Sequence, residues 1–158
     1  MRGTMRILRR EFGDDTRAVV ASFGSKEQLS IQQERESDLG IQHVRLDLPS
    51  RFSTGWWLRQ IDKLLSTSLA PGSRVARGCA SAADATLQIG GDNYTLDYGY
   101  PLAFMEIDQR VFALGKPIAL WGASVGPFDA DPGFRDAIAA HLQRFDAILV
   151  RERRSEEI

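Results

Sequence analysis

Hydrophobic and polar positions alternate along the chain in two rhythms, one typical of amphipathic helices and the other of short buried strands. Met5, Leu8 and Phe12 recur at helical spacing, so the chain is expected to open on a helix. With this segment included, helices are predicted at 1–12, 25–40, 52–69, 74–84, 101–114 and 131–145. Short apolar runs bounded by turn residues predict strands at 17–23, 41–48, 85–89, 116–122 and 147–152.

The order of these elements predicts the fold class. From residue 85 onward, strand, helix, strand, helix and strand follow one another with short connections. That order indicates right-handed βαβ units and therefore an α/β fold, with a Rossmann-like, mostly parallel sheet that carries helices on both faces. A chain of 158 residues is long enough for one domain with a core but not for two full-sized domains. Residues 1–158 are therefore expected to form a single domain.

Composition and charge narrow the function classes. Hydrophobic residues make up 43% and charged residues 26% of the chain, which is typical of a globular protein. The formal net charge of -1 gives no global reason to expect a nucleic-acid partner. The single Cys79 excludes an internal disulfide and a cysteine-rich metal site, which fits a reducing compartment. No apolar run approaches the roughly 18 residues of a membrane span, so we expect a cytoplasmic protein. We also expect no bound metal.

Polar chemistry gathers where three of the predicted strands end. The loops that follow these strands start near Gly90, Gly122 and Arg151, about 30 residues apart, which is the length of one βα repeat. In a parallel sheet such loops emerge at the carboxyl edge, where ligands of open α/β folds bind. The sequence therefore predicts that the three loops lie side by side and form a site.

The first loop has two interpretations from its residues alone. Gly90 and Gly91 either permit a tight turn or let a ligand approach the backbone. Asp92 and Asn93 either cap that turn, or bind hydroxyl groups and act as an acid or base.

The second and third loops have residue types that suit an anion. Gly122 and Gly126 would let backbone amides approach a ligand, Ser124 supplies a hydroxyl, and a helix N-terminus follows. The alternative is a glycine-rich turn from strand to helix. Arg151 follows an apolar strand and could grip a carboxylate or phosphate, or could instead pair with Glu152.

Taken together, the three loops resemble a known family. "GGDNYTLDYG", "GKPIALWGASVGPF" and "RERRS" are similar, in this order and spacing, to the N-terminal half of the polysaccharide pyruvyl transferases, and the resemblance covers about 83–155. It implies a two-domain GT-B architecture and transfer of enolpyruvate from phosphoenolpyruvate onto a sugar as a ketal, with release of phosphate. Phosphoenolpyruvate would be the donor substrate, with no further cofactor. The acceptor would be a sugar of an exopolysaccharide or related polymer, often lipid-linked at the cytoplasmic face of the membrane.

The resemblance also implies roles for individual residues. Arg151, carried over from the family's "RE" pair, would bind the anionic donor, and the turn from Gly122 to Gly126 would approach the donor or the sugar. Asp92 is the candidate catalytic group that handles the acceptor hydroxyl. Tyr94 and Tyr98 either stack on a sugar ring or pack on the domain.

Two departures from the family pattern lead to further expectations. Family members open with a strand and a glycine-rich loop and continue into a second Rossmann-like half, whereas this chain starts at the following helix and stops at Ile158. We therefore expect an incomplete domain that is inactive in isolation. The alternatives are half of a GT-B glycosyltransferase or nucleotide-sugar enzyme, and a non-catalytic remnant.

A histidine and two tryptophans outside these loops are weaker functional candidates. His141 shares a helix face with Phe134 and Ile138 and is expected to be a packed or rim histidine rather than a catalytic one. Trp56 and Trp57, flanked by arginines, either pack in the core or touch a membrane that carries the acceptor.

Overall fold

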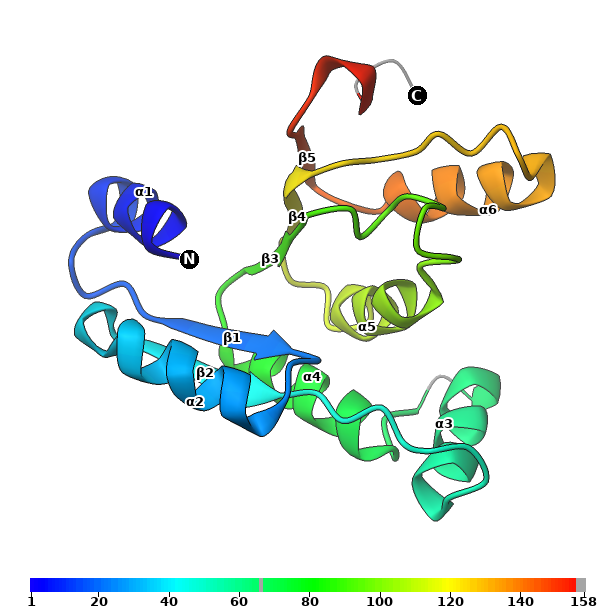
Figure 1. The fold of residues 1–158 in the computed structure, drawn as a ribbon, viewed down its shortest axis with the longest axis horizontal. Coiled ribbons are helices and arrows are strands. Elements are labelled where there is room, and N and C mark those ends of the chain that lie inside the picture. Colours follow the sequence, from blue (N-terminus) through cyan, green and yellow to red (C-terminus); the bar gives the residue numbers. More distant parts are fainter. Residues whose placement is uncertain (66, 156–158) are drawn as a thin grey trace. The chain divides into compact units, whose positions relative to one another are not determined.

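The computed structural model describes residues 1–65 and 67–155, which fold as two compact units that divide between Cys79 and Ala80 (Figure 1). The described residues contain six α-helices and five strands, and every strand pairing is parallel. This confirms the α/β fold with parallel sheets. The strands form two sheets, one of two strands and one of three, and each unit holds one sheet.

The first unit is built around a βαβ repeat. Strands β1 (Ala18–Ser22) and β2 (Ile41–Arg45) pair in parallel, from Ala18 opposite Ile41 to Ser22 opposite Arg45, and helix α2 (Lys26–Arg35) connects them. The connection begins at Ser25, which forms a capping box with Gln28. After the 3-10 turn η1 (Ser37–Leu39), Gly40 ends the connection in the left-handed region, at φ 63°.

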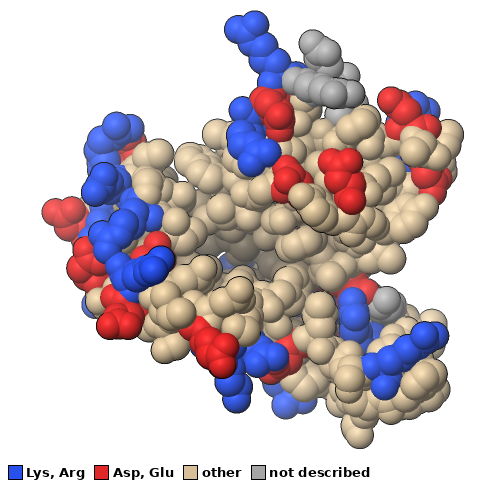
Figure 2. Space-filling model, in the orientation of Figure 1, with Lys and Arg blue, Asp and Glu red and all other residues tan. Residues whose placement is uncertain are grey.

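Helix α1 (Arg2–Phe12) is tied to the end of that connection by its arginines. Arg2 pairs with Asp38 at 2.8 Å, and Arg9 Nη2 donates to the Leu39 carbonyl at 2.7 Å. Figure 2 shows the basic side chains gathered over α1. Of the apolar stripe predicted for this helix, Met5 is fully buried, whereas Phe12 at its end is 74% exposed.

Helix α3 (Thr54–Leu65) is shorter than predicted and leaves much of its apolar face exposed. Trp57 is 58% exposed, so its ring does not pack in the core of the unit. Asp62, on the other face, is fully buried and accepts hydrogen bonds from the backbone N–H groups of Leu69 and Ala70, at 2.6 and 2.9 Å. These bonds turn the chain into helix α4 (Pro71–Ala82). None of the helices in the described ranges is both long and apolar enough to cross a membrane.

The second unit holds the three strands whose ends carry the predicted loops. Strands β3 (Thr86–Ile89), β4 (Ile118–Ala123) and β5 (Ala147–Val150) pair in that order, with β4 in the centre. Helices α5 (Leu102–Phe112) and α6 (Pro132–Leu142) connect them and lie on the same side of the sheet (Figure 1). The predicted N-cap of α6 is present, since the Asp131 side chain accepts a bond from the Phe134 N–H.

One hydrophobic core joins these two helices to the sheet. Ile118 and Leu120 alternate along β4 and are buried at 2% and 0% exposure, as a strand with one covered face requires. They pack with Val111 of α5 and Ile138 of α6 in a single cluster. A core on this side of the sheet holds β4 firmly and fixes where the loops at its carboxyl end begin.

Candidate functional site

The loops after β3 and β4 are joined by backbone hydrogen bonds that continue beyond the strands. The Ser124 N–H donates to the Gly91 carbonyl, and the Gly126 N–H donates to the Tyr94 carbonyl, each at 2.9 Å. Tyr94 and Val125 form a parallel bridge between these two bonds. The first two predicted loops therefore lie side by side, as the rule for carboxyl edges of parallel sheets predicts.

Two glycines are needed for this arrangement. A Cβ at Gly90 would lie 2.4 Å from the Cβ of Ala123, so only glycine lets β3 and β4 approach at this point. Gly122 has a φ of 64° and is the extra residue of a β-bulge, because Trp121 and Ala123 pair with consecutive residues of β5. Gly91, in contrast, has open space around its Cα.

The third loop meets the first two through Arg151. Its Nη2 lies 3.0 Å from Asp92 Oδ1, 2.7 Å from Ser124 Oγ and 3.5 Å from Glu152 Oε1. Ser124 in turn donates its hydroxyl hydrogen to Glu152. We call these four residues the arginine cluster. Each was identified from the sequence, and the structure brings them together from three strand ends.

The arginine cluster is open to solvent on one side. The Arg151 and Asp92 side chains are 54% and 39% exposed, whereas Ser124 is buried. An ion pair this exposed contributes about 0–1 kcal/mol to stability, so a ligand anion can replace the carboxylates at little cost. The three contacts of Arg151 all use Nη2, and a guanidinium presents five N–H donors in total.

The expected anion cradle in the second loop is not available in this structure. The amides of Ser124 and Gly126 bond to the first loop, and the Val125 N–H donates to Ser155 Oγ at 3.0 Å. The N-terminus of α6 is capped by Asp131. These amides already have protein acceptors, whereas Arg151 joins the first and second loops and is the cation of the arginine cluster that could bind an anion.

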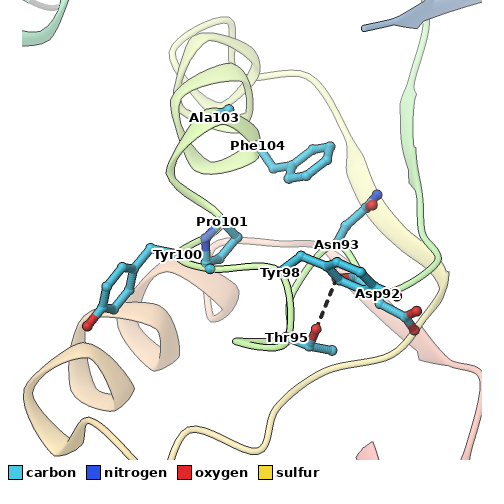
Figure 3. A pocket seen from close by; sticks show the side chains of 9 residues that line it. Asp92, Asn93, Thr95, Tyr98, Tyr100, Pro101, Ala103 and Phe104 are labelled. Carbon is cyan, nitrogen blue, oxygen red and sulfur yellow. Dashed lines mark hydrogen bonds between the residues drawn. The ribbon is translucent and has the colours of Figure 1, made fainter. Parts of the chain in front are cut away.

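A pocket of about 340 Å³ opens beside the first loop (Figure 3). It extends from Asp92 and Asn93 to the first turn of α5, and it is lined by Asp92, Asn93, Thr95, Tyr98, Gly99, Tyr100, Pro101, Ala103 and Phe104. Asp92 therefore belongs both to this pocket and to the arginine cluster. We call it the aromatic pocket.

No group of three or more His, Cys, Asp or Glu side chains that could hold a metal ion is found within residues 1–65 and 67–155.

A family model described as polysaccharide pyruvyl transferase matches residues 1–158. The chain belongs to the polysaccharide pyruvyl transferase family. Searches of curated proteins and of solved structures return no match.

Membership places the chain in a transferase family whose acceptor is a polysaccharide. It confirms the resemblance seen in the three loops and extends it over the N-terminal unit as well. The arginine cluster and the aromatic pocket are accordingly the candidate site of a pyruvyl transferase domain.

Tyr94 of this pyruvyl transferase domain lies inside the core rather than in the site. Its ring is fully buried, which leaves no surface on which a sugar could stack, and its hydroxyl donates to the Asp108 carboxylate. His141 Nε2 lies 3.0 Å from the same carboxylate. Burial raises the pKa of Asp108, and burial together with the nearby Asp108 charge raises that of Tyr94. His141 is thus a packed histidine, as expected, and the network anchors the first loop to α5 and α6.

Tyr98 and Asn93 remain at the surface of the site. Tyr98 is 83% exposed, and Asn93 Nδ2 donates to the Ile89 carbonyl at 3.2 Å, which holds the turn after β3. Thr95, Tyr100 and Phe104 line the aromatic pocket but were not identified from the sequence. The sequence around Phe104 indicates only an ordinary helix, whereas the tyrosines that cluster near Tyr100 could have predicted this pocket.

Proposed function

We propose that this domain takes part in the transfer of enolpyruvate from phosphoenolpyruvate to a sugar of a cell-surface polysaccharide, forming a ketal. The observation that supports this proposal is the arginine cluster, in which one guanidinium and one carboxylate from separate strand ends lie 3.0 Å apart. Phosphoenolpyruvate carries a carboxylate and a phosphate, which an arginine binds through charge-assisted hydrogen bonds.

The reaction balances with an acid and a base and needs no redox partner. A proton adds to the methylene carbon of phosphoenolpyruvate, which becomes the methyl group, and a sugar hydroxyl oxygen bonds to the neighbouring carbon. The bond from that carbon to the phosphate oxygen breaks, with its electron pair leaving on phosphate, and a second hydroxyl oxygen closes the ketal. Of the two hydroxyl protons released, one balances the new methyl group and the other the phosphate.

In this scheme Arg151 binds the donor and Asp92 accepts a hydroxyl proton of the acceptor. Donor binding to Arg151 would release Asp92 from its ion pair, so the arrival of one substrate frees the base for the other. We place the reaction in the cytoplasm, with the acceptor carried on a lipid at the inner face of the membrane.

The test is binding of phosphoenolpyruvate to the purified protein, measured by isothermal titration calorimetry, because the chain is expected to be inactive in isolation. Replacing Arg151 by Ala should raise the dissociation constant of phosphoenolpyruvate about 10- to 100-fold, because a hydrogen-bonded charge is lost. The free energy of unfolding should change by less than about 0.5 kcal/mol, as is usual for an exposed substitution. Arg151→Lys keeps the charge but not the paired N–H groups of the guanidinium. Its dissociation constant for phosphoenolpyruvate should therefore lie between those of the wild type and Arg151→Ala.

Two results would contradict the proposal. Binding of a nucleotide sugar, with no binding of phosphoenolpyruvate, would indicate a glycosyltransferase. Parallel loss of phosphoenolpyruvate binding and of stability in Arg151→Ala would indicate that Arg151 has a structural role only.

A further inference from the structure

The aromatic pocket has the residue types that recognise a sugar ring. Phe104, from α5, and Tyr98, from the first loop, lie on either side of it, with Pro101 between them (Figure 3). The Tyr100 ring points away from the pocket, toward α6, where its hydroxyl donates to Asp131 at 2.7 Å. Aromatic faces suit the C–H face of a pyranose, and a few polar groups at one end suit its hydroxyls.

The charge of the pocket separates the two substrates. Of the described residues that line it, Asp92 alone carries a charge at neutral pH, and that charge is negative. Phosphoenolpyruvate finds no cation in this lining, whereas Arg151 lies at 3.0 Å from the Asp92 carboxylate. The donor therefore suits the Arg151 side of Asp92, and an uncharged ligand suits the pocket side.

The volume of the pocket limits the size of that ligand. About 340 Å³ lies at the lower end of the roughly 300–1,000 Å³ typical of small-molecule sites. This is room for one sugar residue rather than for a longer stretch of polymer.

We infer that the aromatic pocket binds a single neutral pyranose of the acceptor in preference to a uronic acid, an inference that rests on the proposed function. Asp92 is then the shared boundary, with the acceptor hydroxyl on one side and the donor on the other. A uronic acid would bring its carboxylate into a lining whose one charge has the same sign, and like charges repel.

The first experiment compares matched ligands on the purified protein by saturation-transfer NMR. Methyl glucoside and methyl galactoside are the neutral probes, and the corresponding methyl uronides differ from them by the carboxylate. We expect the dissociation constants of the uronides to be up to about fivefold higher than those of the neutral glycosides, because like charges repel at close range. Equal or tighter binding of the uronides would overturn the assignment to neutral sugars.

The second experiment changes the wall of the pocket. Tyr98 is 83% exposed, so Tyr98→Ala removes the ring without opening the core. We expect the dissociation constant of the neutral glycosides to rise about 3- to 10-fold, with that of phosphoenolpyruvate unchanged. Tyr98→Phe, which keeps the ring, should bind both ligands as tightly as the wild type.

The outcomes separate this inference from the proposed function. Binding of phosphoenolpyruvate that depends on Arg151, with unchanged glycoside binding in Tyr98→Ala, would overturn the pocket assignment and leave the proposed function standing. Glycoside binding that depends on Tyr98, without any binding of phosphoenolpyruvate, would support the pocket and contradict the proposed function.

Discussion

At the scale of single residues, the site depends on positions where the surrounding atoms allow few residue types. Gly90 is the clearest case, because a methyl group there would meet both the Cβ and, at 2.5 Å, the Cα of Ala123. A flexible side chain could move away from the added methyl group, but the backbone of β4 cannot. The neighbouring Gly91 has no such restriction, which provides a matched comparison in the same turn.

We predict that Gly90→Ala destabilises the protein by about 1–3 kcal/mol, the usual cost of overpacking, whereas Gly91→Ala changes the free energy of unfolding by less than about 0.5 kcal/mol. Urea unfolding of the two variants would measure the difference. Similar unfolding free energies for both would mean that β3 and β4 separate readily, and that the close contact is not a requirement of the fold.

Much of the site was predictable at this scale, and part was not. Asp92 and Arg151 are 59 positions apart, yet the edge rule for parallel strands predicted that they meet. Whether an amide in the second loop is free or already bonded depends on the register between two loops, and no residue type encodes that register. The same holds for Tyr94 and Tyr98, which have the same side chain but are 0% and 83% exposed.

At the scale of elements, most helices and strands follow from hydrophobic spacing and end signals. Asp131 caps α6 and Gly40 ends the α2 connection, as their residue types indicate. Helix α3 was predicted to reach residue 69 but ends at Leu65. Its end is set by buried Asp62, whose bonds to Leu69 and Ala70 are contacts across a turn that periodicity does not report.

The pKa of Asp62 should make this turn sensitive to acid. Burial pushes the pKa up, but hydrogen bonds from the Leu69 and Ala70 N–H groups and the Thr67 hydroxyl outweigh it, so the pKa is lowered. A lowered pKa stabilises the folded state fully above the ordinary aspartate value of about 3.9. That contribution disappears as the pH falls through the lower, folded-state value.

We predict that Asp62→Asn lowers the free energy of unfolding at pH 7 by about 1–3 kcal/mol, since it weakens acceptance from the Leu69 and Ala70 N–H groups. The difference in the free energy of unfolding between Asp62→Asn and the wild type should narrow below about pH 4, as the wild-type carboxyl becomes protonated. Thermal unfolding across pH 2–7 would test this, with the exposed Asp136→Asn as control. A gap that stays constant with pH would show that the charge of Asp62 does not stabilise the turn.

At the scale of the whole molecule, the two units differ in how their sheets are supported. The sheet of the first unit has two strands, each with one pairing neighbour, and isolated two-stranded sheets are marginal in water. In the second unit β4 pairs on both sides and lies on the core shared by α5 and α6. Stability is therefore expected to be uneven along the chain.

Hydrogen–deuterium exchange should reveal this difference. We predict the slowest exchange for the amides of β4, with β1 and β2 exchanging faster by at least an order of magnitude, because their opening costs less free energy. Peptide-level mass spectrometry covers both segments in one experiment. Equal protection of β1 and β4 would contradict this prediction and indicate a single cooperative unit.

The backbone bonds between the first two loops have a consequence for how specificity can change. Because the Ser124 and Gly126 amides hold the first loop at Gly91 and Tyr94, the main chain at the site is already ordered before any ligand arrives. Ligand binding therefore pays little conformational entropy for this part of the chain. Exposed side chains such as Tyr98 can then be exchanged during evolution or in the laboratory, so that the preferred acceptor changes while the scaffold stays as it is.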